Sequence, residues 1–250
     1  MSSFSQSQLH ARSATIGLAL AIVMFVTWVG VHLWSMFGFV LGNHWPFVPI
    51  IIALQCWLSV GVFIVAHDAM HGSLAPGLNR LNAFVGASVL RLYAGFAWRR
   101  MRDAHLEHHK HPGSAKDPDF NADNAHDFWP WYTRFLKHYF GWQSVAFISC
   151  VVLVYYFGFY VPLENIVLLY AVPAIASSFQ LFYFGTYRPH RHEASAFPDK
   201  HNARTNHFGS MASLFSCFHF GYHHEHHLSP ETPWWGLPRA HREYMRDQTN

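Results

Sequence analysis

Three groups of histidines have the spacing of metal ligands. His67 and His71 form the first, at positions i and i+4. The other two repeat the offsets i, i+3 and i+4 in His105, His108 and His109 and in His223, His226 and His227. On a helix, residues at these offsets lie on one side. Neutral imidazoles gathered in this way can bind a metal ion, whereas protonated ones would repel one another.

The number of these histidines indicates two ions. One catalytic zinc takes three or four protein ligands, and the three groups offer eight. Imidazole suits iron, zinc and copper. The three cysteines, Cys56, Cys150 and Cys217, contain no CxxC pair, so we expect neither a thiolate site nor a disulfide framework. A lone histidine would more often be structural, and only the three groups together favour a metal site.

Other polar residues near the groups have roles that the sequence leaves open. His190, His192 and His219 are further candidate ligands, while His111 and His224 are either ligands or surface residues. Neighbouring carboxylates either accept hydrogen bonds from imidazole N–H groups, which fixes the tautomer, or only solvate a helix. These carboxylates are Asp68, Asp103, Glu107, Glu193 and Glu225.

The elements that must position the histidines are apolar. Charged residues make up 12% of the chain, about half the usual ~25% of soluble domains. Since a membrane span needs about 20 apolar residues, we predict transmembrane helices at about 14–41, 47–66, 144–161 and 166–184. The expected fold is an all-α integral membrane protein, one domain over 1–250, with a helical cap formed by 67–143 and 185–250. We expect an interfacial or re-entrant helix over 81–98.

The positive charges give this topology an orientation. All 17 Lys and Arg residues lie before the first span, in 67–143 or in 185–250, and none lies in the short turns 42–46 and 162–165. The positive-inside rule therefore predicts that both termini and the histidine cap are cytoplasmic. The net charge is only +3, with no basic stripe, so we expect no nucleic-acid partner.

Metal-binding histidines beside a membrane suggest oxygen chemistry on an apolar substrate. A water-soluble substrate would not need a site against the lipid bilayer. A metal transporter, the alternative class, would carry polar ligands along a path through its spans. His32 is the only ionisable residue of that kind in the predicted spans. The sequence therefore favours an enzyme.

The motifs resemble those of bacterial β-carotene ketolases, in the membrane fatty-acid desaturase and hydroxylase superfamily. The resemblance covers about residues 60–236. It is carried by His67-Asp68-Ala69-Met70-His71-Gly72, Pro112-Gly113, Asp117-Pro118-Asp119-Phe120, Phe184-Gly185-Thr186, Pro189-His190-Arg191-His192 and Cys217-Phe218-His219-Phe220-Gly221-Tyr222-His223-His224-Glu225-His226-His227-Leu228.

The resemblance implies an O2-dependent di-iron oxygenase of the bacterial inner membrane. It would use two Fe2+ ions, molecular oxygen and electrons from ferredoxin or a similar donor. Two successive hydroxylations and a dehydration would place a ketone at ring carbon 4, and then at 4′, of β-carotene. The products would be echinenone and canthaxanthin, or astaxanthin from zeaxanthin. A carotenoid ring hydroxylase and a fatty-acid desaturase or hydroxylase of the same superfamily remain alternatives.

The resemblance also implies the catalytic metal ligands. These are His67, His71, His105, His108, His109, His223, His226 and His227, joined by His190, which we favour over His192, and by His219 as a further candidate. Aromatic residues could line a slot for a flat polyene or simply pack in the core; they are Tyr93, Phe96, Trp98, Phe218 and Tyr222.

Overall fold

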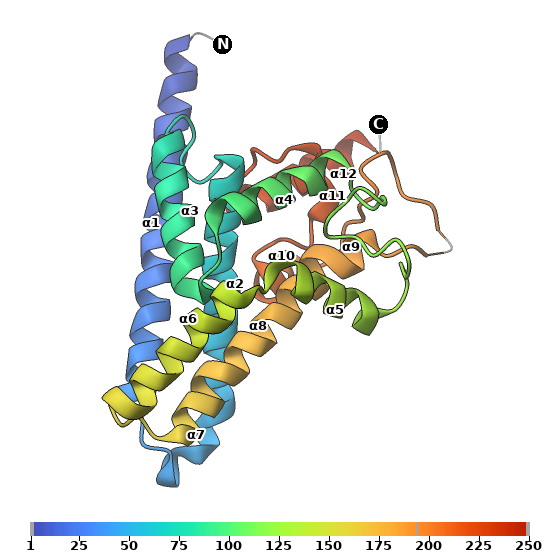
Figure 1. Cartoon of the computed structure of the whole chain (residues 1–250). Helices are drawn as coiled ribbons and strands as arrows, with labels where there is room; N and C mark the ends of the chain where they lie inside the picture. The colour runs from blue at the N-terminus through green and yellow to red at the C-terminus, as the bar shows by residue number, and fades with distance from the viewer. Residues whose placement is uncertain (1–2, 194, 249–250) are drawn as a thin grey trace.

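The structure, a computed structural model, describes residues 3–193 and 195–248, and all regular structure within these ranges is helical. Long apolar helices form a bundle, and the histidine-bearing helices lie at one end of it (Figure 1). The first and last described residues lie at that end, whereas the turn at 42–47 and the short helix α7 lie at the other. The all-helical prediction is confirmed.

Helices α1 (Ser3–Phe37) and α2 (Val48–His71) form an antiparallel hairpin, joined through the 3-10 helix η1 (Gly42–Phe47). We predicted that the second span would end at residue 66, but α2 continues to His71. Nothing in the sequence interrupts the helix before Gly72, whose φ of +77° gives the left-handed end that glycine adopts most readily. His67 and His71 therefore lie in the last turns of a spanning-length helix.

Helix α3 (Asn79–Ala94) runs back beside α2, and α4 (Trp98–Lys110) crosses the end of the bundle. The two meet closely at Gly86, where an added Cβ would lie 2.0 Å from the Trp98 ring. Glycine at this position therefore lets α4 begin directly over α3. The predicted helix at 81–98 is present as α3, although it ends before Trp98.

The second half of the bundle contains a sharp bend and one long helix. Helix α5 (Phe128–Tyr139) meets α6 (Trp142–Leu153), which ends in the π turn η2 (Val154–Gly158), at 83°. A continuous helix follows, made of α7 (Leu163–Asn165), η3 (Ile166–Ala171), α8 (Val172–Phe182), η4 (Tyr183–Tyr187) and α9 (Arg188–His190). It extends past the predicted end at residue 184, so His190 lies at a helix end.

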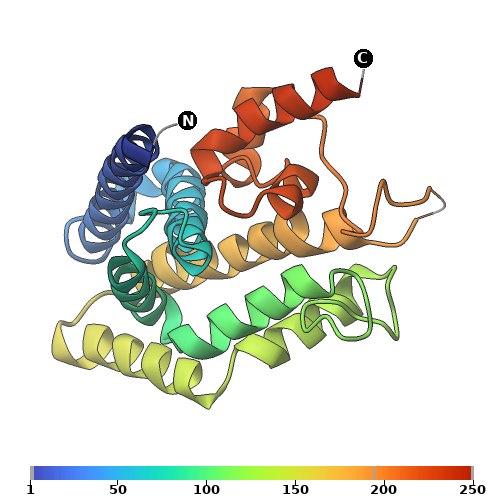
Figure 2. The same ribbon diagram turned by 90° about the horizontal axis from the view of Figure 1, so that it is seen from above.

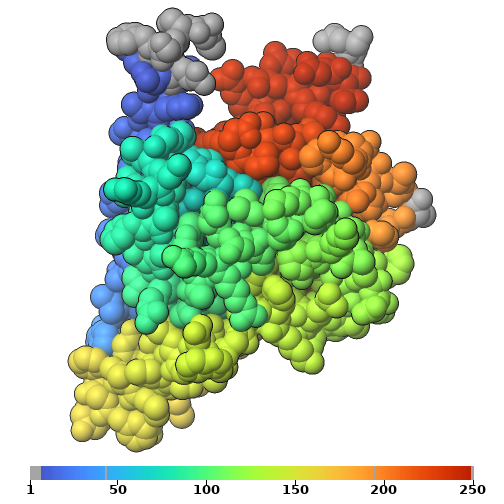
Figure 3. Space-filling view, turned by 45° about the horizontal axis from the view of Figure 1, so that its top comes forward, coloured from blue at the N-terminus to red at the C-terminus, as the bar shows by residue number. Residues whose placement is uncertain are grey.

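The C-terminal helices close the histidine end of the bundle. They are α10 (Ser210–Cys217), α11 (His223–Leu228), η5 (Trp234–Gly236) and α12 (Leu237–Asp247). Seen from above, they lie on one side of the long helix that contains α8, and α4 and α5 lie on the other (Figure 2). The space-filling view shows the C-terminal segment packed directly against 67–143 (Figure 3).

Among the described residues, three helices are long and apolar enough to cross a membrane: Ser7–Phe37, His44–His71 and Leu163–His190. The bent pair Phe128–Tyr139 and Trp142–Gly158 would make a fourth if it counts as one span. Three predicted spans thus coincide with spanning-length helices, while the predicted span at 144–161 is only part of the bent pair. Outward-facing residues of α1 are apolar, with Ile22, Val23 and Val26 each at least 62% exposed, as expected of a lipid-facing helix.

Candidate metal centre

Nine of the ten predicted ligands form two adjacent clusters. The five-histidine cluster contains His67 and His71 from α2, His105 and His109 from α4, and His226 from α11. The four-histidine cluster contains His108 from α4, His190 from α9, and His223 and His227 from α11. In each cluster the candidate ligand atoms all lie within 4.8 Å of one another.

The two HxxHH motifs divide between the clusters in opposite ways. On α4, the i and i+4 residues enter the five-histidine cluster and His108 enters the other. On α11, the i and i+4 residues enter the four-histidine cluster and His226 enters the five-histidine one. The clusters adjoin where His109 stacks on His227, with 4.2 Å between the ring centroids. Two ions held here would therefore be neighbours.

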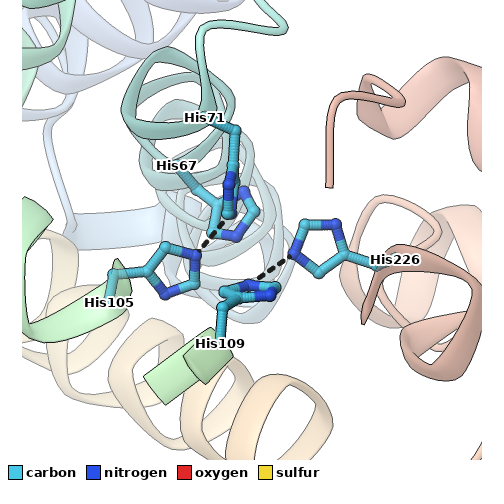
Figure 4. Close-up of side chains that lie close together, drawn as sticks. All are labelled: His67, His71, His105, His109 and His226. Atoms are coloured by element: carbon cyan, nitrogen blue, oxygen red, sulfur yellow. Dashed lines mark hydrogen bonds between the residues drawn. The ribbon is translucent and has the colours of Figure 1, made fainter. Parts of the chain in front are cut away.

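The five-histidine cluster has imidazole nitrogens turned toward a common centre (Figure 4). The Nε2 atoms of His71 and His105 are 2.7 Å apart, and those of His109 and His226 are 3.1 Å apart. The Nε2 atom of His67 is buried without a hydrogen-bond partner. Buried polar atoms are normally satisfied, so this unpaired nitrogen fits the role of a metal ligand.

Burial favours the neutral form of these imidazoles. Burial, with repulsion from neighbouring imidazoles as the second cause, holds the pKa of His105, His109 and His226 below the usual value. The same causes lower the pKa of His223 and His227. Each ring therefore has a lone pair available at neutral pH. Metal–nitrogen bonds of about 2.1 Å put opposite ligands roughly 4.2 Å apart, so both clusters have the size that a metal ion needs.

Asp117 orients His108 in the four-histidine cluster. The Nδ1–H group of His108 donates to the two carboxylate oxygens of Asp117, at 3.0 and 2.9 Å, which leaves Nε2 free to bind a metal. Burial alone would lower the pKa of His108, but the carboxylate raises it above its usual value. Burial would raise the pKa of Asp117, but His108 lowers it. Backbone N–H groups of Gly113 and Asp119 donate to the same carboxylate, both at 2.8 Å.

His190 is oriented by the backbone. Its Nδ1–H donates to the carbonyl oxygen of Asn202 at 2.7 Å, which leaves Nε2 3.0 Å from Nε2 of His223. From the sequence we favoured His190 over His192 as a candidate metal ligand. In the structure His190 lies in the four-histidine cluster, whereas His192 is exposed and packs against Phe120 and Phe197.

Most of the carboxylates expected beside the ligands lie elsewhere, which corrects those expectations. Glu107 and Glu193 pair at the surface with Lys110 and Arg191, and Asp103 lies near Arg102. Glu225 is buried but accepts hydrogen bonds from His241 and Thr205. Adjacent helix residues point in different directions, so sequence neighbours of a ligand face away from it. Of these five carboxylates, only Asp68 approaches a cluster histidine, with Oδ1 3.5 Å from Nδ1 of His67.

The remaining candidate histidines lie outside both clusters. His219 stacks beside Tyr222 and Trp234. The ring of His224 is buried against Asp199, 3.0 Å away, and His111 lies near Glu107 at the surface. The sequence missed the roles of Asp117 and Asn202. The Asp-Pro-Asp motif was visible, but a backbone carbonyl such as that of Asn202 leaves no signal in the sequence.

A largely apolar cavity of about 610 Å³ leads to the clusters. Four cluster histidines border it, namely His67, His105, His108 and His223. Of the predicted aromatic lining, only Tyr93 and Phe96 contribute. Trp98 covers Gly86, Phe218 stacks on Trp57, and Tyr222 stacks on His241. An elongated apolar molecule in this cavity would have one end beside the histidines.

The fold and the clusters together define an all-helical membrane protein with a site suited to two metal ions. The family model described as fatty acid desaturase matches residues 43–149 and 128–249. The "Beta-carotene ketolase" of Paracoccus strain PC1 is 41% identical over 91% of this chain and 93% of its own. That of Paracoccus strain N81106 is 45% identical over 86% of this chain and 88% of its own.

A more distant relative is the "Beta-carotene 4-ketolase" of Protosiphon botryoides. It is 34% identical over 91% of this chain and 64% of its own length. No solved structure matches the chain significantly. The chain therefore belongs to the fatty acid desaturase family and, within it, to the group that includes these ketolases, which confirms the resemblance read from its motifs.

Proposed function

We propose that this protein is a β-carotene ketolase, an oxidoreductase that places a keto group at ring carbon 4, and then 4′, of β-ring carotenoids. The observation that carries the proposal is the apolar cavity that ends at the two histidine clusters. A long hydrocarbon can lie in this cavity with one ring at the clusters. The Paracoccus relatives are named beta-carotene ketolases, and the name of the Protosiphon relative gives position 4.

The nine clustered histidines would hold two iron ions. His67, His71, His105, His109 and His226 would bind one, and His108, His190, His223 and His227 the other. Bound iron would supply the activation of O2 needed to hydroxylate the allylic ring carbon 4, with electrons from a donor such as ferredoxin. Asp117 and Asn202 keep His108 and His190 in the tautomer with Nε2 available.

The protein itself contributes orientation and the exclusion of water. The cavity walls fix the direction of the polyene, so the same ring carbon meets the clusters in two successive hydroxylations. The resulting geminal diol loses water to give the ketone. An apolar wall also keeps bulk water away from the reacting carbon.

The same proposal includes the orientation in the membrane. The histidine clusters and both described chain ends lie at one end of the bundle, and the turns at the other end carry no Lys or Arg. The positive-inside rule then puts the clusters and termini on the cytoplasmic side of a bacterial inner membrane. An electron donor from the cytoplasm would reach them there.

Expression in bacteria that accumulate β-carotene tests the proposal. We expect 4-keto products by chromatography and mass spectrometry, first with one keto group and then with two. Products hydroxylated at ring carbon 3 would indicate the ring hydroxylase, and altered fatty acids with unchanged pigments the desaturase. Unchanged pigments and lipids, from folded, iron-loaded protein with a working electron donor, would overturn the proposal.

A further inference from the structure

The cavity has a second polar end, which the proposed reaction does not use. His32 of α1, Gln55 of α2 and Tyr170 of η3 line it there, deep among the spanning helices. The wall between this end and the histidine clusters is mainly apolar, and includes Phe63, Ile64, Phe135, Ile175 and Leu181.

Polar groups along that wall are already paired with protein atoms. The Tyr93 hydroxyl is hydrogen-bonded to Ser177 at 2.9 Å. Ser59 donates to the carbonyl oxygen of Gln55 at 2.7 Å and accepts from the Trp28 indole at 2.9 Å. These hydroxyls have little capacity left for a ligand.

The groups at the far end, in contrast, have unused capacity. The side-chain oxygen of Gln55, a residue only 3% exposed, has no hydrogen-bond partner, and its amide nitrogen makes only a long 3.5 Å contact with the Trp28 carbonyl. His32 uses Nε2 in a 2.8 Å hydrogen bond with the Tyr155 hydroxyl, and its ring also meets Tyr170. An unpaired buried amide oxygen is unfavourable, so a ligand that pairs with it would gain binding energy.

The distance between the two ends suits a carotenoid. With a rise of about 1.5 Å per residue, Gln55 is roughly 18 Å along α2 from His67, and Tyr170 is at most about 30 Å along its helix from His190. An extended chain advances about 1.2 Å per bond, so ring carbons 4 and 4′ of a carotenoid are about 28 Å apart. The axial separation of Gln55 and His67 is shorter than this span, so a carotenoid with one ring at the clusters lies obliquely to α2, and its far ring then lies near the polar end. The rings of His32 and Tyr170 meet there, with centroids 5.3 Å apart.

We propose that His32, Gln55 and Tyr170 form a subsite for the oxygen substituent on the carotenoid ring that is not being oxidised. This inference rests on the proposed ketolase function and extends it to the far ring. A carotenoid oxidised at both rings must enter twice, in opposite directions, so its first ketone lies at the far end during the second reaction. The amide, imidazole and phenol can donate to a ketone, and the Gln55 oxygen can accept from a hydroxyl.

The substitution Gln55→Leu tests the subsite by removing both amide hydrogen-bonding groups at similar volume. Gln8→Leu is the matched control, because Gln8 is exposed and outside the cavity. Iron-loaded wild type and variants in membranes, with an electron donor, are given β-carotene or its mono-keto product in separate assays. We expect Q55L to lower kcat/KM for the mono-keto substrate roughly tenfold more than for β-carotene, mainly through KM. Q8L should leave the ratio unchanged.

Binding to metal-free protein gives an independent readout. Trp28 lies beside Gln55, so quenching of tryptophan fluorescence can report carotenoid binding. Q55L should weaken binding of the mono-keto carotenoid selectively. If Q55L does not accumulate, His32→Phe is measured with the same expectation, because it removes the imidazole from the opposite wall.

An unchanged ratio of the two kcat/KM values, in whichever variant accumulates, overturns the subsite. Failure of the wild type to form any 4-keto product overturns the proposed function instead. Because the wild type is assayed first with β-carotene, the two failures are distinguishable.

Discussion

The two histidine clusters share α4 and α11, yet their ligands are held in different ways. The five-histidine cluster takes two i, i+4 pairs from single helices, His67 with His71 and His105 with His109, and one single ligand, His226; three of its members are only half-buried. The four-histidine cluster is fully buried and contains one such pair, His223 with His227, and two single ligands, His108 and His190. Each of these last two has a hydrogen-bond partner outside the cluster, which Asp117 and Asn202 supply.

This difference shows two ways of positioning a ligand. A helix fixes the separation of an i, i+4 pair by itself, so such a pair needs little further support. A ligand that is the only one its helix gives to a cluster, such as His108 or His190, depends on tertiary contacts for both its position and its ring orientation. The four-histidine cluster should therefore respond more strongly to changes in its surroundings.

The largest expected effect comes from removing a ligand. His226→Ala should lower the metal content of the five-histidine cluster, and His223→Ala that of the other. Both should reduce activity by more than the 10–100-fold typical of losing an outer hydrogen-bond partner. Metal-to-protein ratios and ketolase rates measure the effect. His224→Ala is the control, because its ring contacts Asp199 and not a cluster; full activity in H226A would remove His226 from the ligands.

A smaller effect should follow from Asp117→Asn, which keeps the shape but removes the charge that holds His108. We expect a loss of about 10- to 100-fold in metal affinity or activity. Glu107→Gln, on the exposed side of α4, is the matched control and should remain close to wild type. If D117N and E107Q lowered metal affinity or activity equally, Asp117 would have no special role in holding His108. That result would contradict the proposed difference in how the two clusters hold their ligands.

Acid should destabilise the metal-free protein. Histidine in the unfolded chain has a pKa of about 6.5, whereas burial lowers the folded pKa of His105, His109, His223, His226 and His227. Below about pH 6.5 the unfolded chain therefore binds more protons, and stability falls as the pH is lowered. His108 acts in the opposite direction, because its raised pKa gives a contribution that is present below 6.5 and lost at higher pH.

The histidines with a lowered pKa outnumber His108, whose pKa is raised. The Tm of the metal-stripped protein in detergent should therefore fall as the pH is lowered from 7.5 to 5.5. In D117N the opposing contribution of His108 is lost, so the fall should be steeper. A Tm that rises toward pH 5.5 would contradict this account.

The smallest effect is expected outside the clusters. His219→Phe should leave metal content unchanged and activity within about twofold, because this ring stacks on Tyr222 and Trp234 rather than joining a cluster. Loss of one metal ion from this variant would place His219 among the ligands. Elemental analysis of purified protein decides between these outcomes.

Several features of the fold were predictable because they depend on local sequence. The apolar runs gave the spanning-length helices, and the histidine spacings gave the ligand pairs on α2, α4 and α11. The ends of the helices were less predictable. Hydropathy falls after residue 66, but α2 continues to His71 and is ended by Gly72. A helix continues through polar residues until a helix-ending residue such as glycine interrupts it.

Partners of the ligands were predicted poorly for a physical reason. Glu107 and Glu225 are next to ligands in the sequence, but on a helix adjacent side chains point in different directions. Asp117 reaches His108 only through the turn that follows α4, and the sequence does not give the direction of that turn.

The sequence by itself identified the candidate metal ligands, the three motifs that share a helix face, and the segments apolar enough to lie in a membrane. Only the tertiary structure divided nine histidines into two clusters, selected Asp117 and Asn202 as their partners, and formed a cavity from the clusters to Gln55 and His32. Spacing along one helix is set by the backbone. Distances between helices are set by the packing of side chains far apart in the sequence.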